Sequence, residues 1–229
     1  VRDAMVKPVD PSIEYRPGVE MTLVLTKPLV WNIPGQTFTV ASIEPADQIA
    51  SLVSSLPFRT TAQSPPAPSD LTNLIFIGTE QQVSDAFQTA GWYTAAALSE
   101  ASKMETARAI IENRGYNEAP VSLLLLDGKA PDLVFQKQTN TFAMRHHIRI
   151  WRNRSTFNGL PVWIGAATHD IGIDFSEQSH SFTHKIDSNI DAERAKIVND
   201  LLFAHSVQAL AIVERPNIPA NISNATGDA

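Results

Sequence analysis

Arginines and histidines alternate along residues 141–151, TFAMRHHIRIW, a segment whose pattern predicts a strand. Because side chains on a strand alternate between its two faces, Arg145, His147 and Arg149 share one face and His146 lies on the other. A histidine between two guanidinium groups repels cations and suits a phosphate or carboxylate. Two interpretations stay open. The face could bind an anionic ligand, or its arginines could pair with acids on a neighbouring strand.

His146 belongs to the apolar face of the same strand, together with Ile148 and Ile150. A histidine on such a face is more often a hydrogen-bonded core residue than a reactive one. We therefore predict a structural, buried His146.

A second group of polar residues lies in residues 183–194, THKIDSNIDAER, where a strand is predicted to lead into a helix. His184, Asp187, Asp191 and Glu193 fall close together there. Such a cluster can orient a histidine as an acid or base, or supply oxygen and imidazole ligands to a divalent metal. The spacing is not a recognised zinc pattern, so a metal is the weaker alternative.

The start of that helix also has a purely structural explanation. Ser188 is predicted to cap it with Asp191 at the third helical position, and negative charge is favoured at a helix N-terminus. Arg194, three residues after Asp191, is expected to form a local ion pair with it.

Residues 161–170, PVWIGAATHD, connect these two groups. Small residues at 165–167 let another backbone or a ligand approach closely, and Asp170 just after them is a candidate acid, although a turn aspartate is more often structural. The chain has no Gly-x-Ser-x-Gly elbow, phosphate-binding glycine loop, His-Glu-x-x-His or dinucleotide fingerprint. These absences argue against a serine hydrolase of the elbow type, a nucleoside triphosphatase, a zincin and a dehydrogenase.

The composition of the chain excludes further classes of function. A net charge of -6 and a pI near 5.5 argue against nucleic acid as the main partner. The absence of cysteine excludes disulfides and thiol nucleophiles. No apolar run approaches the roughly 20 residues that a membrane-spanning helix needs, so we expect no transmembrane segment.

The elements that must position these residues follow from hydrophobic periodicity. Short strands are predicted at 21–26 and 36–43, a loop or linker at 60–70, a buried strand at 71–78 and a capped helix starting after Thr79 and ending at Gly91. A second helix is predicted at about 102–115, a hairpin around Asp127-Gly128, further strands near 141–151, 161–167 and 180–186, and a helix at 189–205. The first strand–helix step favours a parallel crossover.

We therefore predict an α+β fold, with a mixed or mostly antiparallel sheet and helices packed on one face, preceded by a short β segment. The predicted organisation is a lead and β hairpin at 1–44, the main domain at 45–214 and a flexible tail at 215–229.

Five segments of the chain resemble the C-terminal domain family of LssY proteins, a bacterial group named after a type I secretion component. They are DLTNLIFIG at 70–78, AGW at 90–92, RHHIRIW at 145–151, PVWIGAATHD at 161–170 and THKIDSNIDAER at 183–194. The resemblance spans about residues 45–214. Some members carry this domain behind membrane segments and a lipid phosphatase domain, which implies work on lipid-linked phosphates at the envelope, by analogy.

The leading hypothesis is an envelope-associated hydrolase or phosphoester-processing domain for an anionic or lipid-linked substrate. In it, His147 and His184 serve as acid and base, Asp170 or Asp187 orients a histidine, and the anionic group is held by Arg145 and Arg149, with Asp191, Glu193 and Arg194 completing the site. An extracytoplasmic or envelope location is favoured over the cytoplasm, with peripheral membrane association in a longer protein.

Two alternatives use the same residues. A noncatalytic module could bind an anionic headgroup, a glycan or a partner protein through the arginine face. A structural adaptor could instead bury these side chains as a polar network between sheet and helix.

Overall fold

A computed structural model describes residues 26–27, 40–63, 66–94, 123–138, 144–176, 181–219 and 222–223. In chain order its elements are β1 (Ala41–Ser42), α1 (Ala46–Ser55), β2 (Arg59–Gln63), β3 (Pro66–Leu71), β4 (Leu74–Ile77), α2 (Glu80–Thr89), β5 (Tyr93–Thr94), β6 (Leu124–Leu125), β7 (Leu133–Gln138), β8 (Met144–Phe157), β9 (Leu160–Ser176), β10 (Ser181–Ile186), α4 (Ile190–Phe203) and β11 (Ala209–Leu210). None of the helices in the described ranges has an apolar stretch of the length that spanning a bilayer requires.

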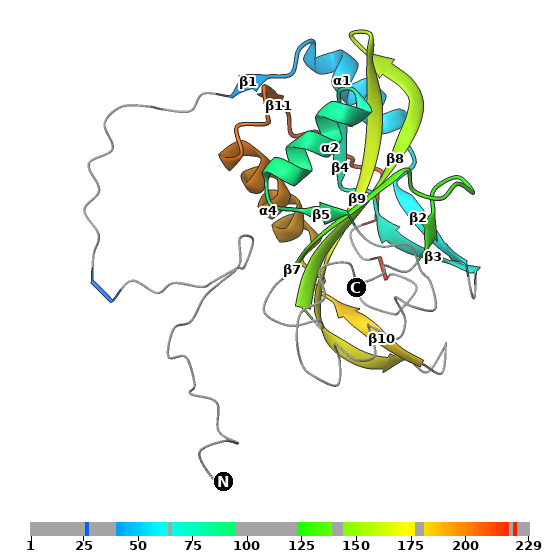
Figure 1. Cartoon of the computed structure of the whole chain (residues 1–229). Coiled ribbons are helices and arrows are strands. Elements are labelled where there is room, and N and C mark those ends of the chain that lie inside the picture. Colours follow the sequence, from blue (N-terminus) through cyan, green and yellow to red (C-terminus); the bar gives the residue numbers. More distant parts are fainter. Residues whose placement is uncertain are drawn as a thin grey trace.

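The long hairpin of β8 and β9 forms the centre of the molecule (Figure 1). Its two-residue loop is Asn158-Gly159, and both residues have positive φ angles, 50° and 77°. This is the requirement of a type I′ turn, whose twist matches that of the flanking strands. The register that follows pairs His147 with Thr168 and His146 with His169.

All pairings in the six-stranded sheet are antiparallel, in the order β10-β9-β8-β7-β5 with β4 also on β9. β4 pairs with the first part of β9 and β10 with the last part, so they share one edge of that strand. β4 and β5 therefore run in the same direction on either side of α2, but three strands separate them. The parallel crossover expected at this step joins distant strands rather than neighbours.

Helices α2 and α4 pack side by side on one face of this sheet (Figure 1). Thr79 and Gln82 form the predicted capping box at the start of α2. At its end Gly91, at φ 79°, donates to Gln88 O and Trp92 donates to Phe87 O, which is a complete Schellman motif. The buried Val83 and Phe87 of this helix then pack against strand residues of the sheet.

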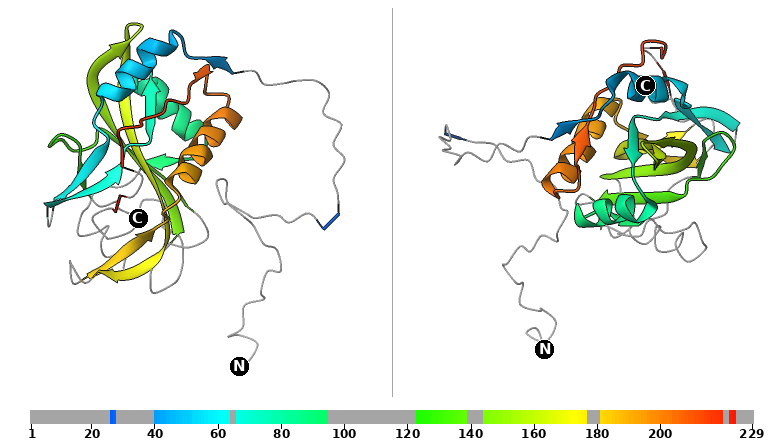
Figure 2. Two further views of the ribbon diagram at one scale, coloured as in Figure 1. Left: turned by 180° about the vertical axis from the view of Figure 1, so that it is seen from behind. Right: turned by 90° about the horizontal axis from the view of Figure 1, so that it is seen from above.

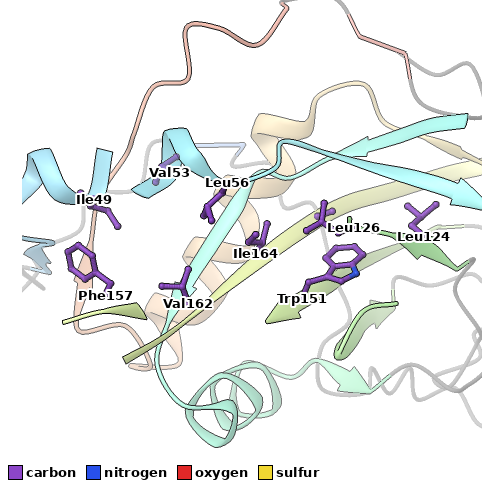
Figure 3. Close-up of a cluster of buried hydrophobic side chains, with 10 residues drawn as sticks. Ile49, Val53, Leu56, Leu124, Leu126, Trp151, Phe157, Val162 and Ile164 are labelled. Atoms are coloured by element: carbon purple, nitrogen blue, oxygen red, sulfur yellow. The ribbon is translucent and has the colours of Figure 1, made fainter. Parts of the chain in front are cut away.

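The opposite face carries α1 and a three-stranded sheet of order β3-β2-β6 (Figure 2). Its apolar cluster joins α1 to the two long strands and to the turn after β6 (Figure 3). The residues of this cluster are Ile49, Val53, Leu56, Leu124, Leu126, Trp151, Phe157, Val162, Ile164 and Ala166.

The α+β class with a mostly antiparallel sheet is confirmed. One prediction is wrong: residues 60–70 are not a linker, because β2 and β3 form an antiparallel hairpin there. Pro66 and Pro68 lie in β3, an edge strand of its sheet, where a missing N–H is tolerated. Proline content alone therefore misled the interpretation.

The hairpin predicted around Asp127-Gly128 is only partly found. Both residues have positive φ angles and Leu126 bridges to Lys129, as a tight turn requires. However, β6 before the turn pairs with β2, and β7 after it pairs with β8. Of the strands predicted at 21–26 and 36–43, only β1 at Ala41–Ser42 is described, and the helix predicted at 102–115 lies outside the described residues.

Candidate functional site

The two adjacent histidines lie on opposite faces of the central sheet, as the alternation predicts. His147 has its contacts with Asp170, Arg149 and Thr168, on the face covered by β2 and β3. His146 faces α4, where it contacts Glu193. The two polar groups are therefore separated by the sheet itself.

On the β2–β3 side, the row of Arg145, His147 and Arg149 is buried and bonded to carboxylates of the chain. Asp170, from β9, accepts a hydrogen bond from Arg145 Nε at 3.1 Å and lies 2.8 Å from His147 Nε2. Asp70, from β3, accepts from Arg149 Nη1 at 3.3 Å. We call these five residues the arginine network.

The arginine network is an ion network inside the protein, not on its surface. Burial lowers the pKa of the Arg149 guanidinium, while the carboxylates of Asp70 and Asp170 oppose that shift and the charge of Arg145 adds to it. The alternative in which the arginines pair with acids of neighbouring strands is the one observed, although that face is buried rather than exposed.

Thr168 lies beside His147 but is not aligned with it as a nucleophile. Its Oγ1 is 3.3 Å from His147 Nδ1 and 3.2 Å from Nε2, so it points at neither nitrogen lone pair. A nucleophile and its base need a direct hydrogen bond to one nitrogen, with the orienting acid on the other. His147, Thr168 and Asp170 therefore lack the geometry of a catalytic triad.

On the α4 side, His146, His169 and Glu193 form a compact group that we call the histidine–glutamate cluster. One potential metal-ligating atom from each lies within 4.8 Å of those of the other two. Glu193 Oε2 is 2.6 Å from His146 Nδ1, and the rings of His146 and His169 stack with their centroids 4.1 Å apart. Three different elements, β8, β9 and α4, thus each contribute one residue.

Glu193 is the most constrained member of the cluster. It lies in the first turn of α4 and is only 3% exposed. Its second oxygen, Oε1, has no hydrogen-bond partner among the residues that the structure describes. A buried carboxylate oxygen without a partner is costly, so packing alone does not explain why a glutamate occupies this position.

Asp187 connects the cluster to the surface. Its Oδ2 lies 3.9 Å from His169 Nδ1, and its N–H donates to the carbonyl oxygen of His169 at 2.8 Å. The side chains of His169 and Asp187 are 23% and 38% exposed, whereas those of His146 and Glu193 are both 3% exposed. The cluster is therefore buried at one end and accessible to solvent at the other.

The remaining predicted site residues lie apart from this cluster. The backbone of His184 pairs with Ile173, five positions along β9 from the partner of His147, or about 17 Å at the usual rise of a strand. Its side chain is outside the described part of the structure. Asp191 and Arg194 form the predicted ion pair at 2.8 Å, on the surface of α4.

The predicted cap of the last helix is wrong by one residue. Asn189, not Ser188, caps α4, and its side chain accepts from the N–H of Ala192. Asp187 supports this turn by accepting from the N–H of Asn189. With this cap Glu193 lies in the first turn of α4, and its side chain contacts His146 of the sheet.

The small residues at 165–167 admit the protein's own side chains. A Cβ on Gly165 would lie 3.0 Å from Ile148 Cδ1, 3.1 Å from Phe76 Cε2 and 3.3 Å from Leu74 Cβ. The space above Gly165 is therefore part of the core and holds no ligand site. A surface groove of about 490 Å³ lies elsewhere, between the turn before β7 and the outer half of β8, and none of the predicted site residues line it.

Sequence reasoning missed His169 as a site residue and assigned His146 to the core alone. The available signal was the alternation in residues 161–170, which puts His169 on the opposite face from Asp170. The strand register that sets it opposite His146 could not be read from the sequence.

Comparison with known protein families shows to which family the chain belongs. The family model described as LssY C-terminus matches residues 33–229. The chain belongs to this family. Neither a curated protein nor a solved structure matches the chain. The match of this LssY C-terminal domain is longer than the 45–214 expected from motifs, because it includes the end of the chain and the region before α1.

Proposed function

We propose that this LssY C-terminal domain is a hydrolase that activates water at the histidine–glutamate cluster. The observation that carries the proposal is the buried carboxylate of Glu193, held 2.6 Å from His146 and adjacent to the partly exposed His169. Buried carboxylates next to imidazoles are typical of sites that move protons.

The arrangement suggests separate tasks for the three residues. Glu193 orients and polarises His146 from the buried end. His169 is partly exposed to solvent and is oriented by Asp187. It takes a proton from a water molecule while the oxygen of that water attacks the substrate. The bond to the leaving group then breaks, and the leaving group receives that proton.

The substrate that we propose is an anionic, phosphoester-containing molecule of the envelope, including lipid-linked ones. Arg194 follows Glu193 in α4 and its side chain is 40% exposed. Its ion pair with Asp191 is at the surface, where such pairs contribute little stability and exchange partners readily. We assign the anionic group of the substrate to Arg194 rather than to the buried arginine network.

Turnover of chromogenic esters tests this function. Purified protein is assayed with a phosphomonoester, a phosphodiester and a carboxylic ester, and the Glu193→Gln variant is compared with the wild type. Loss of a positioned acid–base group costs about 10²–10⁴-fold, so we expect kcat/KM to fall by at least about 100-fold.

Glu80→Gln is the matched control, because Glu80 is an exposed glutamate in the first turn of α2. It is expected to keep wild-type turnover. Equal activity of the Glu193→Gln and Glu80→Gln variants, or no turnover of any of the three esters by the wild type, would contradict the proposal.

A further inference from the structure

The histidine–glutamate cluster has the donor set of a metal site. Two imidazoles and one carboxylate are the three protein ligands of one group of catalytic zinc sites, in which a fourth position stays open for water. The chain has no cysteine, so no thiolate can complete or compete with this set. The two imidazole ligands favour zinc and neighbouring divalent transition metals over magnesium and calcium.

The distances are close to those that coordination needs. Ligand atoms around a tetrahedral ion with bonds of 2.0–2.2 Å are separated by roughly 3.3–3.6 Å. The three candidate atoms lie within 4.8 Å of one another, so none has to move by more than about 1.5 Å. The contact between His146 and Glu193, 2.6 Å at present, would open by about 1 Å as both atoms turn to the ion.

Two features of the surroundings point to a cation. Glu193 Oε1 is buried and lacks a hydrogen-bond partner in the described part of the chain, and a bound cation would remove that cost. Asp187 lies 3.9 Å from His169 Nδ1, and a carboxylate behind a histidine is the usual arrangement that orients a metal-bound imidazole. His169, whose side chain is 23% exposed, is the member of the cluster that lies nearest to solvent.

We propose that His146, His169 and Glu193 bind one divalent transition-metal ion of the zinc type, with Asp187 as the residue that orients His169. This rests on the proposed function and changes its proton acceptor. A His169 that binds the ion through one nitrogen and faces Asp187 with the other has no lone pair for a proton, so the ion rather than His169 would activate the water. Such an ion lowers the pKa of a bound water toward neutrality. The chain's own residues supply three ligands, which in a four-coordinate site leaves one position for water.

Zinc binding by the whole chain tests the proposal independently of activity. Protein stripped with a chelator is titrated with ZnCl₂ in competition with a chromophoric chelator. We expect one ion per chain for the wild type and at least about 100-fold weaker binding for Glu193→Gln and for His169→Gln. Asp187→Asn should weaken binding by about 10–100-fold, the usual effect of losing an orienting carboxylate.

His205→Asn is the control, because His205 is an exposed histidine just after α4. Asparagine tolerates the positive φ angle of this residue, 54°. The control should bind zinc as the wild type does. A wild type that binds no stoichiometric zinc, or ligand variants that bind as tightly as His205→Asn, would overturn the proposal.

Thermal unfolding separates loss of ligands from loss of fold. Zinc at about a hundredfold excess over its Kd should raise the Tm of the wild type by about 5–10 °C and leave the Tm of Glu193→Gln unchanged. An equal rise in both proteins contradicts a site at Glu193.

Chelation distinguishes this inference from the proposed function. If the stripped wild type keeps full turnover while Glu193→Gln has none, the metal site is excluded and the hydrolase stands. If zinc binds one to one through these residues but no ester is turned over, the metal site stands and the hydrolase fails.

Discussion

At the scale of single residues, the two sides of the sheet differ in whether their buried charged groups have partners. In the arginine network two buried arginines, one histidine and two aspartates satisfy one another, as expected for ions that are kept out of water. In the histidine–glutamate cluster, Glu193 Oε1 lacks such a partner within the described residues. A buried network whose charges are paired needs no role beyond the fold, whereas a buried carboxylate oxygen without a partner, beside a partly exposed imidazole, favours chemistry.

The arginine network predicts a strong dependence of stability on Asp70. Asp70→Asn removes the carboxylate that Arg149 Nη1 contacts and leaves a buried guanidinium without this charge partner. Breaking a buried pair in this way costs about 3–5 kcal/mol of unfolding free energy, which urea denaturation measures.

Asp191→Asn is the matched comparison, since it breaks the exposed pair with Arg194. We expect a loss of less than about 1 kcal/mol from it. If the two variants lose similar stability, Asp70 and Arg149 do not form a buried ion pair.

At the scale of elements, one side chain joins two strands that share an edge. Asn73, between β3 and β4, uses its side-chain amide to accept from the N–H of Ala167 and to donate to its carbonyl oxygen, both at 3.0 Å. Its side chain thereby pairs with β9 in the gap between β4 and β10, as a strand residue would. Just after β10, the N–H of Asp187 donates to the carbonyl oxygen of His169 in β9. The position of Asp187 at the cluster depends on this continuous edge.

Replacing Asn73 should therefore loosen the edge. Asn73→Ala leaves both backbone groups of the fully buried Ala167 without these partners, at about 1–3 kcal/mol each. The expected loss is roughly 2–5 kcal/mol of unfolding free energy, with faster amide hydrogen exchange at Ala167.

Asn73→Asp keeps the acceptor and loses the donor, so its stability should lie between those of the wild type and Asn73→Ala. If all three proteins unfold at the same urea concentration, the amide bridge contributes nothing to stability.

The elements that the sequence predicted well are those with local signals. The capping box of Thr79 and Gln82 and the glycine at 91 define α2 within one short segment, and alternation alone separated His146 from His147. The Asn158-Gly159 pair is an equally strong local signal for the turn of the central hairpin.

What could not be predicted depends on contacts between distant segments. The meeting of His146, His169 and Glu193 requires the β8–β9 register and the rotation of α4, which no local pattern specifies. The predicted meeting of His147 with the acids of α4 is not found, because Glu193 faces the other side of the sheet. The contact between Arg149 and Asp70 could not be predicted either, because Asp70 lies 79 positions earlier in a proline-rich strand.

At the scale of the whole molecule, both apolar clusters are built on the same two strands. Trp151 belongs to the cluster under α1, and Trp163 belongs to the cluster under α2 and α4. Because β8 and β9 contribute to both, neither layer can lose its packing without exposing the strands that the other one needs. The domain should therefore unfold as one cooperative unit.

Tryptophan substitutions measure this cooperativity. Trp151→Phe and Trp163→Phe each remove one reporter, and urea transitions followed by fluorescence and by far-UV circular dichroism should coincide within each variant. Separate transitions for the two probes would show that the two layers unfold independently.

The central claim is that the reactive residues lie on the α4 side of the sheet and not in the arginine network. The most direct measurement is turnover per folded molecule of two variants, Glu193→Gln and His147→Gln, with the folded fraction taken from urea denaturation. We predict that Glu193→Gln stays folded and loses at least about 100-fold in kcat/KM, whereas His147→Gln loses about 1–3 kcal/mol of stability and keeps its turnover. The opposite result, with turnover abolished in folded His147→Gln and retained in Glu193→Gln, would contradict the account.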